Sequence, residues 1–308
     1  MADVSDDELF KLVVEADDEA LGEGAPPKGR GILTIQKVMK RLGYQGYVLA
    51  GRGTPAIVHK IKAMHSSLYR PADLGMGGIH GGIFMFRDVF CRIYIPVMYG
   101  TVGLDPFTLT DMSQQQLRWL GSRPGDMHAF IDQFVDIFDF AGGIAPLGDF
   151  KTPPQEALEL FWLAAFQLQA AAAILSVAFD FRGAIQSALI GAELALKAGL
   201  AAQGIDEAGR KKHGHNLQSA ALAFATAHSG FDINLVEQTL STMPAYVKNR
   251  YSPTQPNRQQ TGHIVMGAQY VAAEVMRQLT LFSARTTMPE FAQRIYPSRT
   301  EDTPVESQ

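Results

Sequence analysis

The sequence predicts an all-α protein, and three observations support this. The 308 residues are 46% apolar and 19% charged, which is typical of a globular chain long enough to bury a large core. Apolar residues recur at helical spacing in several segments, most regularly between Gly183 and Arg285. The connections between those last segments are short, which favours antiparallel neighbouring helices. We therefore expect an antiparallel four-helix bundle preceded by an irregular, mainly helical N-terminal region.

Residues 1–29 are expected to be a flexible acidic arm. They contain a short possible helix from Asp6 to Val14 and end in a run rich in glycine and proline. In the following region, residues 30–150, the apolar spacing predicts helices over Ile32–Leu42 and Thr54–Leu68.

Residues 71–82 form a glycine-rich stretch that matches neither the dinucleotide fingerprint nor the P-loop, so it is interpreted as a connecting loop with His80 in solvent. The next segment, Ile83–Tyr99, is ambiguous. Its β-branched and aromatic residues suit a strand, whereas Arg87, Asp88 and Arg92 would share one side of a helix, and we favour the helix.

Asp126–Ala141 is predicted to be an amphipathic helix. Its aromatic residues would face the core, and Asp132, Asp136 and Asp139 would form a solvated face rather than a Mg²⁺ site, since no partner motif is found. Glycines and prolines between 142 and 154 then indicate a boundary. Residues 151–182 are assigned to a connector whose apolar helix, Ala157–Phe179, is interpreted as a core helix buried on several sides rather than a membrane span.

Residues 183–290 carry the four-helix pattern, and residues 291–308 are expected to be a flexible tail. Asp232 and Thr261 are predicted N-caps, and Glu193 with Lys197 is a predicted ion pair. The four helices are expected over Gly183–Ala202, His215–Thr226, Asn234–Met243 and Thr261–Arg285.

Four features in this region resemble those of a known family: the run Glu193–Ala198, the segment Lys212–Leu217, Tyr246 followed by Arg250 and Tyr251, and an alanine-rich last helix. Together they resemble a HEPN domain, the small helical domain of nucleotide-binding and RNA-cleaving proteins. The resemblance implies either a non-cleaving binding or assembly module or a metal-independent ribonuclease.

For a ribonuclease, the resemblance implies an arginine and a histidine near the start of the last helix, usually completed across a homodimer. Arg258 and His263 have that spacing. Histidine would move the 2′-hydroxyl proton, and arginine would hold the phosphate. A helix starting at Thr261 would leave Arg258 in the preceding loop. The same spacing recurs between Arg210 and His215, before the second helix.

The preferred interpretation is a binding module without turnover. A basic cluster would contact the phosphates of a nucleotide or RNA, helped by a helix N-terminus near His215. Tyr251 could stack on a base or pack under its own loop. A solvated basic edge explains the same residues, and a structural or oligomeric protein with Phe161 and Trp162 at an interface is a third alternative. The predicted phosphate-contacting residues are Arg210, Lys211, Lys212, His215, Lys248, Arg250 and Tyr251.

Net charge and cysteine content limit the kinds of ligand and site that this chain can have. A net charge of −4 gives no overall attraction to nucleic acid or anionic membrane, so phosphate binding would need a local patch. The single cysteine, Cys91, excludes an intrachain disulfide and a cysteine-rich zinc site. We expect no cofactor or metal, no membrane partner, a cytoplasmic location, and a homodimer formed through the C-terminal bundle.

Overall fold

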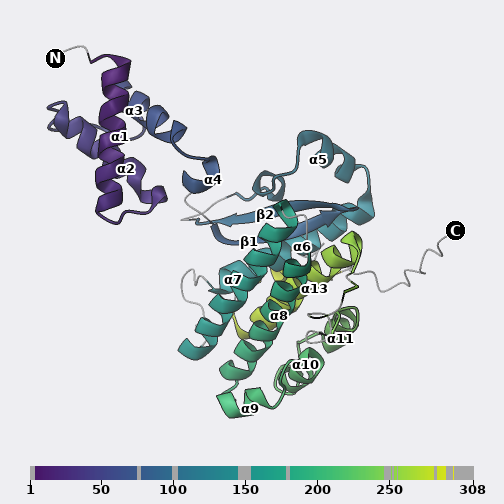
Figure 1. Cartoon of the computed structure of the whole chain (residues 1–308). Coiled ribbons are helices and arrows are strands. Elements are labelled where there is room, and N and C mark those ends of the chain that lie inside the picture. Colours follow the sequence, from purple (N-terminus) through teal and green to yellow (C-terminus); the bar gives the residue numbers. More distant parts are fainter. Residues whose placement is uncertain are drawn as a thin grey trace. The chain divides into compact units, whose positions relative to one another are not determined.

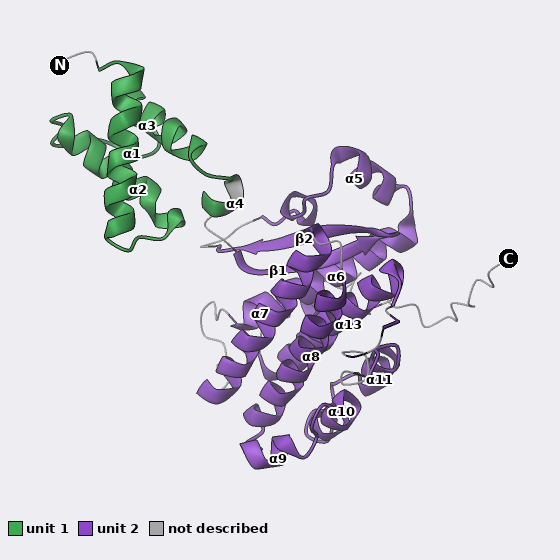
Figure 2. Cartoon of the chain, in the orientation of Figure 1, with its two compact units in different colours: residues 1–77 green, residues 78–308 purple. Residues whose placement is uncertain are grey.

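The computed structural model of the chain describes residues 4–74, 78–98, 103–144, 154–177, 181–245, 251, 253–254, 256–280, 283–288 and 294. The chain divides into two compact units, residues 1–77 and residues 78–308 (Figure 2). Helices dominate the described residues of both, which confirms the helical class. The division lies between Gly77 and Gly78, whereas the predicted boundary lay between 142 and 154.

The first unit is built on three helices, α1 (Asp6–Gly22), α2 (Pro27–Arg41) and α3 (Ala56–Ser67), followed by the short α4 (Pro71–Leu74). A capping box starts α1, in which the Ser5 and Glu8 side chains bond each other's backbone N–H groups. Leu9 and Val13 of α1 are fully buried against α2 and α3. The predicted flexible arm is therefore wrong over α1, because the acidic residues cover one side of a helix whose other side is apolar.

The second unit begins with an antiparallel hairpin of β1 (Gly78–Phe86) and β2 (Val89–Pro96). Phe86 pairs with Val89, so Arg87 and Asp88 form a two-residue turn, and Arg87 has the positive φ of 61° that such turns use. The predicted helix over Ile83–Tyr99 is wrong. The β-branched and aromatic residues form the strands, and two of the charged residues that suggested a helix face lie in the turn.

The hairpin packs on a layer of helices. After η1 (Pro106–Leu109) and α5 (Gln114–Gly121), the chain forms α6 (Pro124–Ile144), α7 (Gln155–Val177) and α8 (Arg182–Ala202). In Figure 1 the strands cross this layer, and β1 contacts α6, α7 and α13. The helices predicted over Asp126–Ala141 and Gly183–Ala202 are confirmed as α6 and α8.

The C-terminal helices are α9 (Glu207–Lys211), α10 (Leu217–Ala225), α11 (Ile233–Ser241), α13 (Arg258–Leu279) and α14 (Ala284–Thr287). The cap at Asp232 is confirmed, since its side chain accepts from Leu235 N–H. The cap predicted at Thr261 is wrong. Asn257 caps α13 in a capping box with Gln260, so the helix starts one turn earlier and includes Arg258.

Helices α8, α10, α11 and α13 share one hydrophobic core with α6, α7 and the hairpin. A side chain joins the hairpin to the helices. Gln269 of α13 accepts a bond from Ile83 N–H at 2.8 Å and donates to Ile83 C=O at 3.0 Å, as a neighbouring strand would. The sheet edge is thus satisfied by a helix.

His80 lies inside this core, on β1. It is 2% exposed, its Nδ1 lies 3.2 Å from Gln169 Nε2 of α7, and its ring meets Phe140 of α6 edge-on. Burial lowers the pKa of His80 from 6.5 to about 3, so the ring is neutral at physiological pH. The interpretation of His80 as a solvated loop residue is wrong.

A buried ion-pair cluster lies between α6 and the C-terminal segments. Asp136 is fully buried, and it meets Arg277 Nη2 at 2.6 Å, Arg285 Nη2 at 3.1 Å and Arg294 Nη2 at 2.7 Å. Asp139 accepts from Arg277 Nε at 2.6 Å and from Ala284 N–H at 2.5 Å, and Asp132 pairs with Arg285 at 2.8 Å. The predicted solvated aspartate face is wrong, because these carboxylates have arginine partners.

Burial alone would raise the pKa of Asp136, but the guanidinium groups of Arg294, Arg277 and Arg285 together lower it to about 2. The carboxylate therefore stays charged in the core. Arg294 lies in the segment predicted to be a flexible tail, yet it is 6% exposed and its guanidinium stacks on Tyr270 at 4.2 Å. The rest of the predicted tail lies outside the described residues.

Helix α7 is buried on one side only. Phe161 and Leu168 face the core and are fully buried, whereas Leu163, Phe166 and Val177 are 49%, 57% and 82% exposed. The interpretation of α7 as a helix buried on several sides is wrong, because only one of its faces is buried. Among the described residues, α7 and α8 are also long and apolar enough to cross a membrane by length and composition alone, a property shared by core helices of soluble proteins.

Candidate functional site

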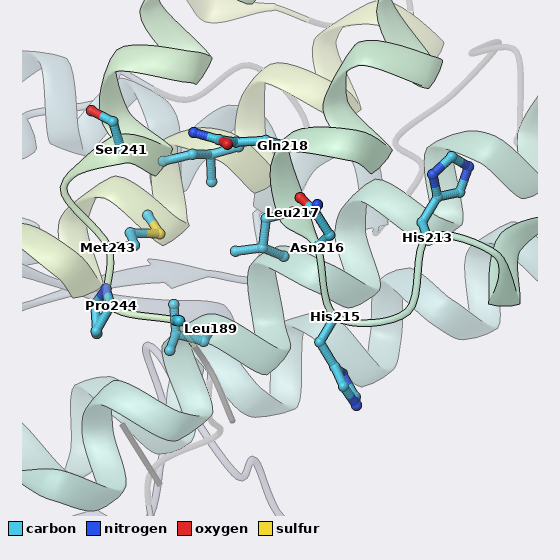
Figure 3. A pocket seen from close by; sticks show the side chains of 11 residues that line it. Leu189, His213, His215, Asn216, Leu217, Gln218, Ser241, Met243 and Pro244 are labelled. Atoms are coloured by element: carbon cyan, nitrogen blue, oxygen red, sulfur yellow. The ribbon is translucent and has the colours of Figure 1, made fainter. Parts of the chain in front are cut away.

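A pocket of about 610 Å³ opens where the chain enters α10. It lies between α8, the segment from His213 to Gln218, and the end of α11 with the residues that follow it (Figure 3). Most of the apolar residues that line it are buried or half-buried and form its floor, whereas most of the polar ones are exposed and form its rim. Apolar side chains come from Leu189, Leu217, Leu240, Met243 and Pro244, and polar ones from His213, His215, Asn216, Gln218 and Ser241.

The start of α10 supplies hydrogen-bond donors to this rim. Asn216 is the N-cap, and its side chain accepts from Ser219 N–H at 3.0 Å. The first bond within the helix is donated by the Ala220 N–H to the Asn216 carbonyl. The N–H groups of Leu217 and Gln218 come before it and therefore have no acceptor within the helix. Together with the positive end of the helix dipole, they form a setting that favours an anion.

The two rim histidines are held differently. Nδ1 of His213 lies 2.8 Å from Ser219 Oγ, and Nδ1 of His215 lies 2.9 Å from Glu193 Oε2. Glu193 in turn pairs with Lys197 at 2.5 Å, which confirms the predicted ion pair. Figure 3 shows the two rings pointing away from each other, so they do not converge on one atom.

The structure does not gather the predicted phosphate contacts into one cluster. Arg210 is 5% exposed, and its guanidinium bonds Glu156 of α7 and the Ile205 carbonyl, so it is a structural residue. Lys211 pairs with Glu207 at 2.8 Å on the surface, and Lys212 is exposed at the end of α9. His215 belongs to the pocket rim.

The remaining predicted contacts lie further along the chain. Lys248 and Arg250 are outside the described residues, as is Tyr246. Tyr251 is 77% exposed, and its stacking on a base stays a prediction.

Arg258 and His263 are both exposed in the first turns of α13. Arg258 Nε donates to Asp88 C=O at 2.5 Å, and its guanidinium lies 4.4 Å from the Phe90 ring centre and 5.1 Å from that of Phe181. Residues five apart on a helix project about 140° from each other. Within one chain, Arg258 therefore holds the hairpin turn and does not face His263.

Two further polar groupings were not anticipated from the sequence. In the first unit, Asp17 bonds His65 at 3.1 Å and Tyr69, while Arg30 bonds Tyr69 at 2.9 Å. In the second unit, a cavity of about 500 Å³ borders the buried ion-pair cluster at Arg277 and Glu274. The acidic and basic groups in both are paired with each other, which is the arrangement of structural networks.

The described residues contain no group of three or more histidine, cysteine or acidic side chains placed to hold a metal ion. Cys91 is buried on β2, and burial raises its pKa to about 12, so the thiol is not a nucleophile at neutral pH.

The sequence drew attention to the segment Lys212–Leu217 but missed the apolar half of the pocket. Leu189 and Met243 have the spacing of ordinary core residues, and only the fold turns them toward the start of α10. The cap at Asn216, which precedes an apolar run, was a readable signal. Comparison with known proteins does not bear on this site, because no family model, curated protein or solved structure matches the chain.

Proposed function

We propose that residues 183–290 act as a HEPN-like binding module, and that the pocket at the start of α10 takes a nucleotide or the phosphate-bearing end of an RNA. One observation carries the proposal: an apolar pocket lies directly against the N-terminus of a capped helix. A base is planar and largely apolar on its faces, so the pocket floor suits it. A phosphate suits the N–H groups of Leu217 and Gln218.

Near His215 the chain carries an exposed lysine and the Glu193–Lys197 ion pair, so the helix N-terminus is the main feature that favours an anion. Lys212 is exposed three residues before His215, and Lys197 lies beside the Glu193 carboxylate that bonds His215. The helix dipole is equivalent to a positive charge of about half an elementary charge at this end, which favours a bound anion. Binding by such a site needs no metal and no turnover.

The test is a charge reversal that spares the fold. Gln218 occupies the second position of α10 and is exposed. Changing Gln218→Glu adds a negative charge where a helix tolerates it well, yet it places that charge beside the proposed phosphate. Coulomb repulsion at about 5 Å near a protein surface is on the order of 1–3 kcal/mol, so we expect affinity to fall about tenfold or more.

Binding is measured by calorimetry with adenosine, AMP, ATP, inorganic phosphate and a short RNA. The matched control is Gln238→Glu, the same change at an exposed position of α11. We expect AMP to bind more tightly than phosphate or adenosine alone, and only Gln218→Glu to weaken it. Absence of binding by the whole panel, or equal effects of the two variants, contradicts the proposal.

Ribonuclease activity is a second candidate, favoured by the exposure of both Arg258 and His263 on α13. Because the two side chains diverge within one chain, a second chain would have to complete the site. Incubation of labelled RNA in EDTA tests this, with His263→Gln as the exposed, fold-sparing variant and His128→Gln, also exposed, as its control. Cleavage that only His263→Gln abolishes would establish the enzyme, and uncut RNA rejects it.

A further inference from the structure

The exposed side of α7 has the residue pattern of a helix-packing seam. Leu163, Phe166, Ala170, Ala173 and Val177 follow one another at spacings of three, four, three and four residues. This is the a/d repeat of a left-handed helix pair. Leu163, Phe166, Ala173 and Val177 are exposed and Ala170 is half-buried, so the seam points away from the core of its own unit. We refer to these five residues as the α7 seam.

We propose that the α7 seam is the interface of a homodimer in which the α7 helices of two chains pack antiparallel. The geometry points to this orientation through residue size. A two-fold axis at Ala170 sets Ala170 against its own copy, Leu163 against Val177, and Phe166 level with Ile174, one residue from Ala173. Each large side chain then meets a smaller one, and every contact away from the axis occurs twice, as an isologous interface requires.

A parallel pair fits less well. It would place Phe166 against Phe166 while Ala170 and Ala173 faced their own copies across a gap. It would also bring Glu159 beside its own copy at the start of the seam. Like charges at such a position are destabilising. Size and charge therefore both favour the antiparallel arrangement.

The residues beside the seam explain why a second copy is a suitable occupant. The flanking positions are Leu160, Gln167 and Ile174 on one side and Trp162, Gln169 and Ser176 on the other, and none is charged. Charges at these positions normally select a different partner or oppose self-pairing. Their absence along α7 leaves self-association unopposed.

A lipid surface fits the same helix poorly. The charged residues of α7 are Glu156 and Glu159, and the helix contains no lysine or arginine. Helices that lie on membranes carry basic residues that attract anionic lipids. The other side of α7 is also committed, since Phe161 and Leu168 are buried in the core.

The size of the seam sets the expected strength. Fourteen residues of rise give a length of about 21 Å, and a helix is about 10 Å wide. Two such strips cover on the order of 400 Å² in total, which is well below the about 1,200 Å² of a small specific interface. We therefore expect a weak, reversible dimer that forms at the upper end of the protein concentrations used below.

Sedimentation velocity on the full chain, from about 1 to about 200 μM, tests the proposal. We expect a concentration-dependent dimer that Leu163→Glu weakens at least tenfold. The matched control is Leu222→Glu on α10, because both leucines are 49% exposed. A chain that stays monomeric, or equal effects of both variants, overturns the proposal. Vesicle binding by a monomeric chain that Leu163→Glu abolishes overturns it in favour of a membrane.

Thiol cross-linking tests the orientation. Ala170→Cys is expected to form a disulfide-linked dimer by itself, because residue 170 lies on the axis. Leu163→Cys is not, since the two copies would be about 21 Å apart, but it should cross-link when mixed with Val177→Cys. The native Cys91 is 2% exposed and does not compete. Cross-linking of Leu163→Cys alone, without the mixed product, rejects the antiparallel pair.

Discussion

Replacing His80 should change how the stability of the second unit depends on pH. The ring is neutral in the folded protein because burial lowers its pKa to about 3, whereas in the unfolded chain the value is near 6.5. Between these values the unfolded state binds a proton that the folded state does not. The free energy of unfolding therefore falls as the pH decreases from 6.5 toward 3.

The size of this effect follows from the two pKa values. When the pH falls from about 7.5 to about 5, proton binding at His80 stabilises the unfolded chain by the equivalent of about 1.5 pKa units. The folded chain gains almost nothing, because His80 stays neutral in it. At 1.36 kcal/mol per unit this is about 2 kcal/mol. The result is insensitive to the folded value, because pH 5 lies well above it.

The assay is urea unfolding of wild type and His80→Gln, followed by tryptophan fluorescence at both pH values. The protein has two tryptophans, Trp119 and Trp162, and both lie in the second unit, so the signal reports on that unit. Other titrating groups contribute equally to both proteins. We expect the stability advantage of wild type over His80→Gln to shrink by about 2 kcal/mol at the lower pH.

Gln238→Leu provides the control, because Gln238 is exposed on α11 of the same unit and neither side chain titrates. Its stability difference from wild type should be the same at both pH values. If the gap between wild type and His80→Gln is also unchanged, His80 is not held neutral by burial, and the reasoning from its position on β1 is refuted.

Two further predictions concern buried polar groups. Asp136→Asn leaves three arginines facing a neutral group, so unfolding should become about 3–5 kcal/mol easier by urea titration, whereas Asp126→Asn, at the exposed start of α6, should cost less than about 1 kcal/mol. Equal losses contradict the ion-pair cluster. Gln269→Leu leaves Ile83 N–H and C=O without their partner and should cost about 2–5 kcal/mol, against about 0.5 kcal/mol for the exposed Gln238→Leu. A loss below about 1 kcal/mol in Gln269→Leu contradicts the role of Gln269 as a strand substitute.

Helix positions could be predicted where the signal is local. The apolar spacing of α6, α8, α10 and α11 and the cap at Asp232 depend on residues within a few turns of one another. The hairpin could not be separated from a helix on such grounds, because charged residues in its turn imitate a helix face. The flexible arm expected over residues 1–29 is wrong over α1, because the acidic residues that suggested an arm cover the solvent side of a helix, and the capping box at Ser5 and Glu8 was the local signal for that helix.

In the candidate site, too, local features could be predicted from the sequence, whereas contacts between distant residues could not. The segment before α10 was identified, because a basic, histidine-containing run next to an N-cap is a local feature. The pairing of Arg210 with Glu156, 54 residues away, removed one predicted phosphate contact. The aspartates of α6 were misplaced because their arginine partners lie 138 or more residues further along the chain. No local pattern distinguishes such a carboxylate from a solvated one.

The hairpin has a consequence for how this protein can associate. The outer edge of β1 is occupied at Ile83 by Gln269, and that of β2 at Arg92 by Asp111, which accepts from Arg92 N–H at 2.7 Å and donates to its carbonyl at 3.2 Å. At these positions the backbone groups that could template a foreign strand are already taken. Growth of the sheet by strand addition from another molecule, a common route to aggregation, is blocked at the middle of both strands.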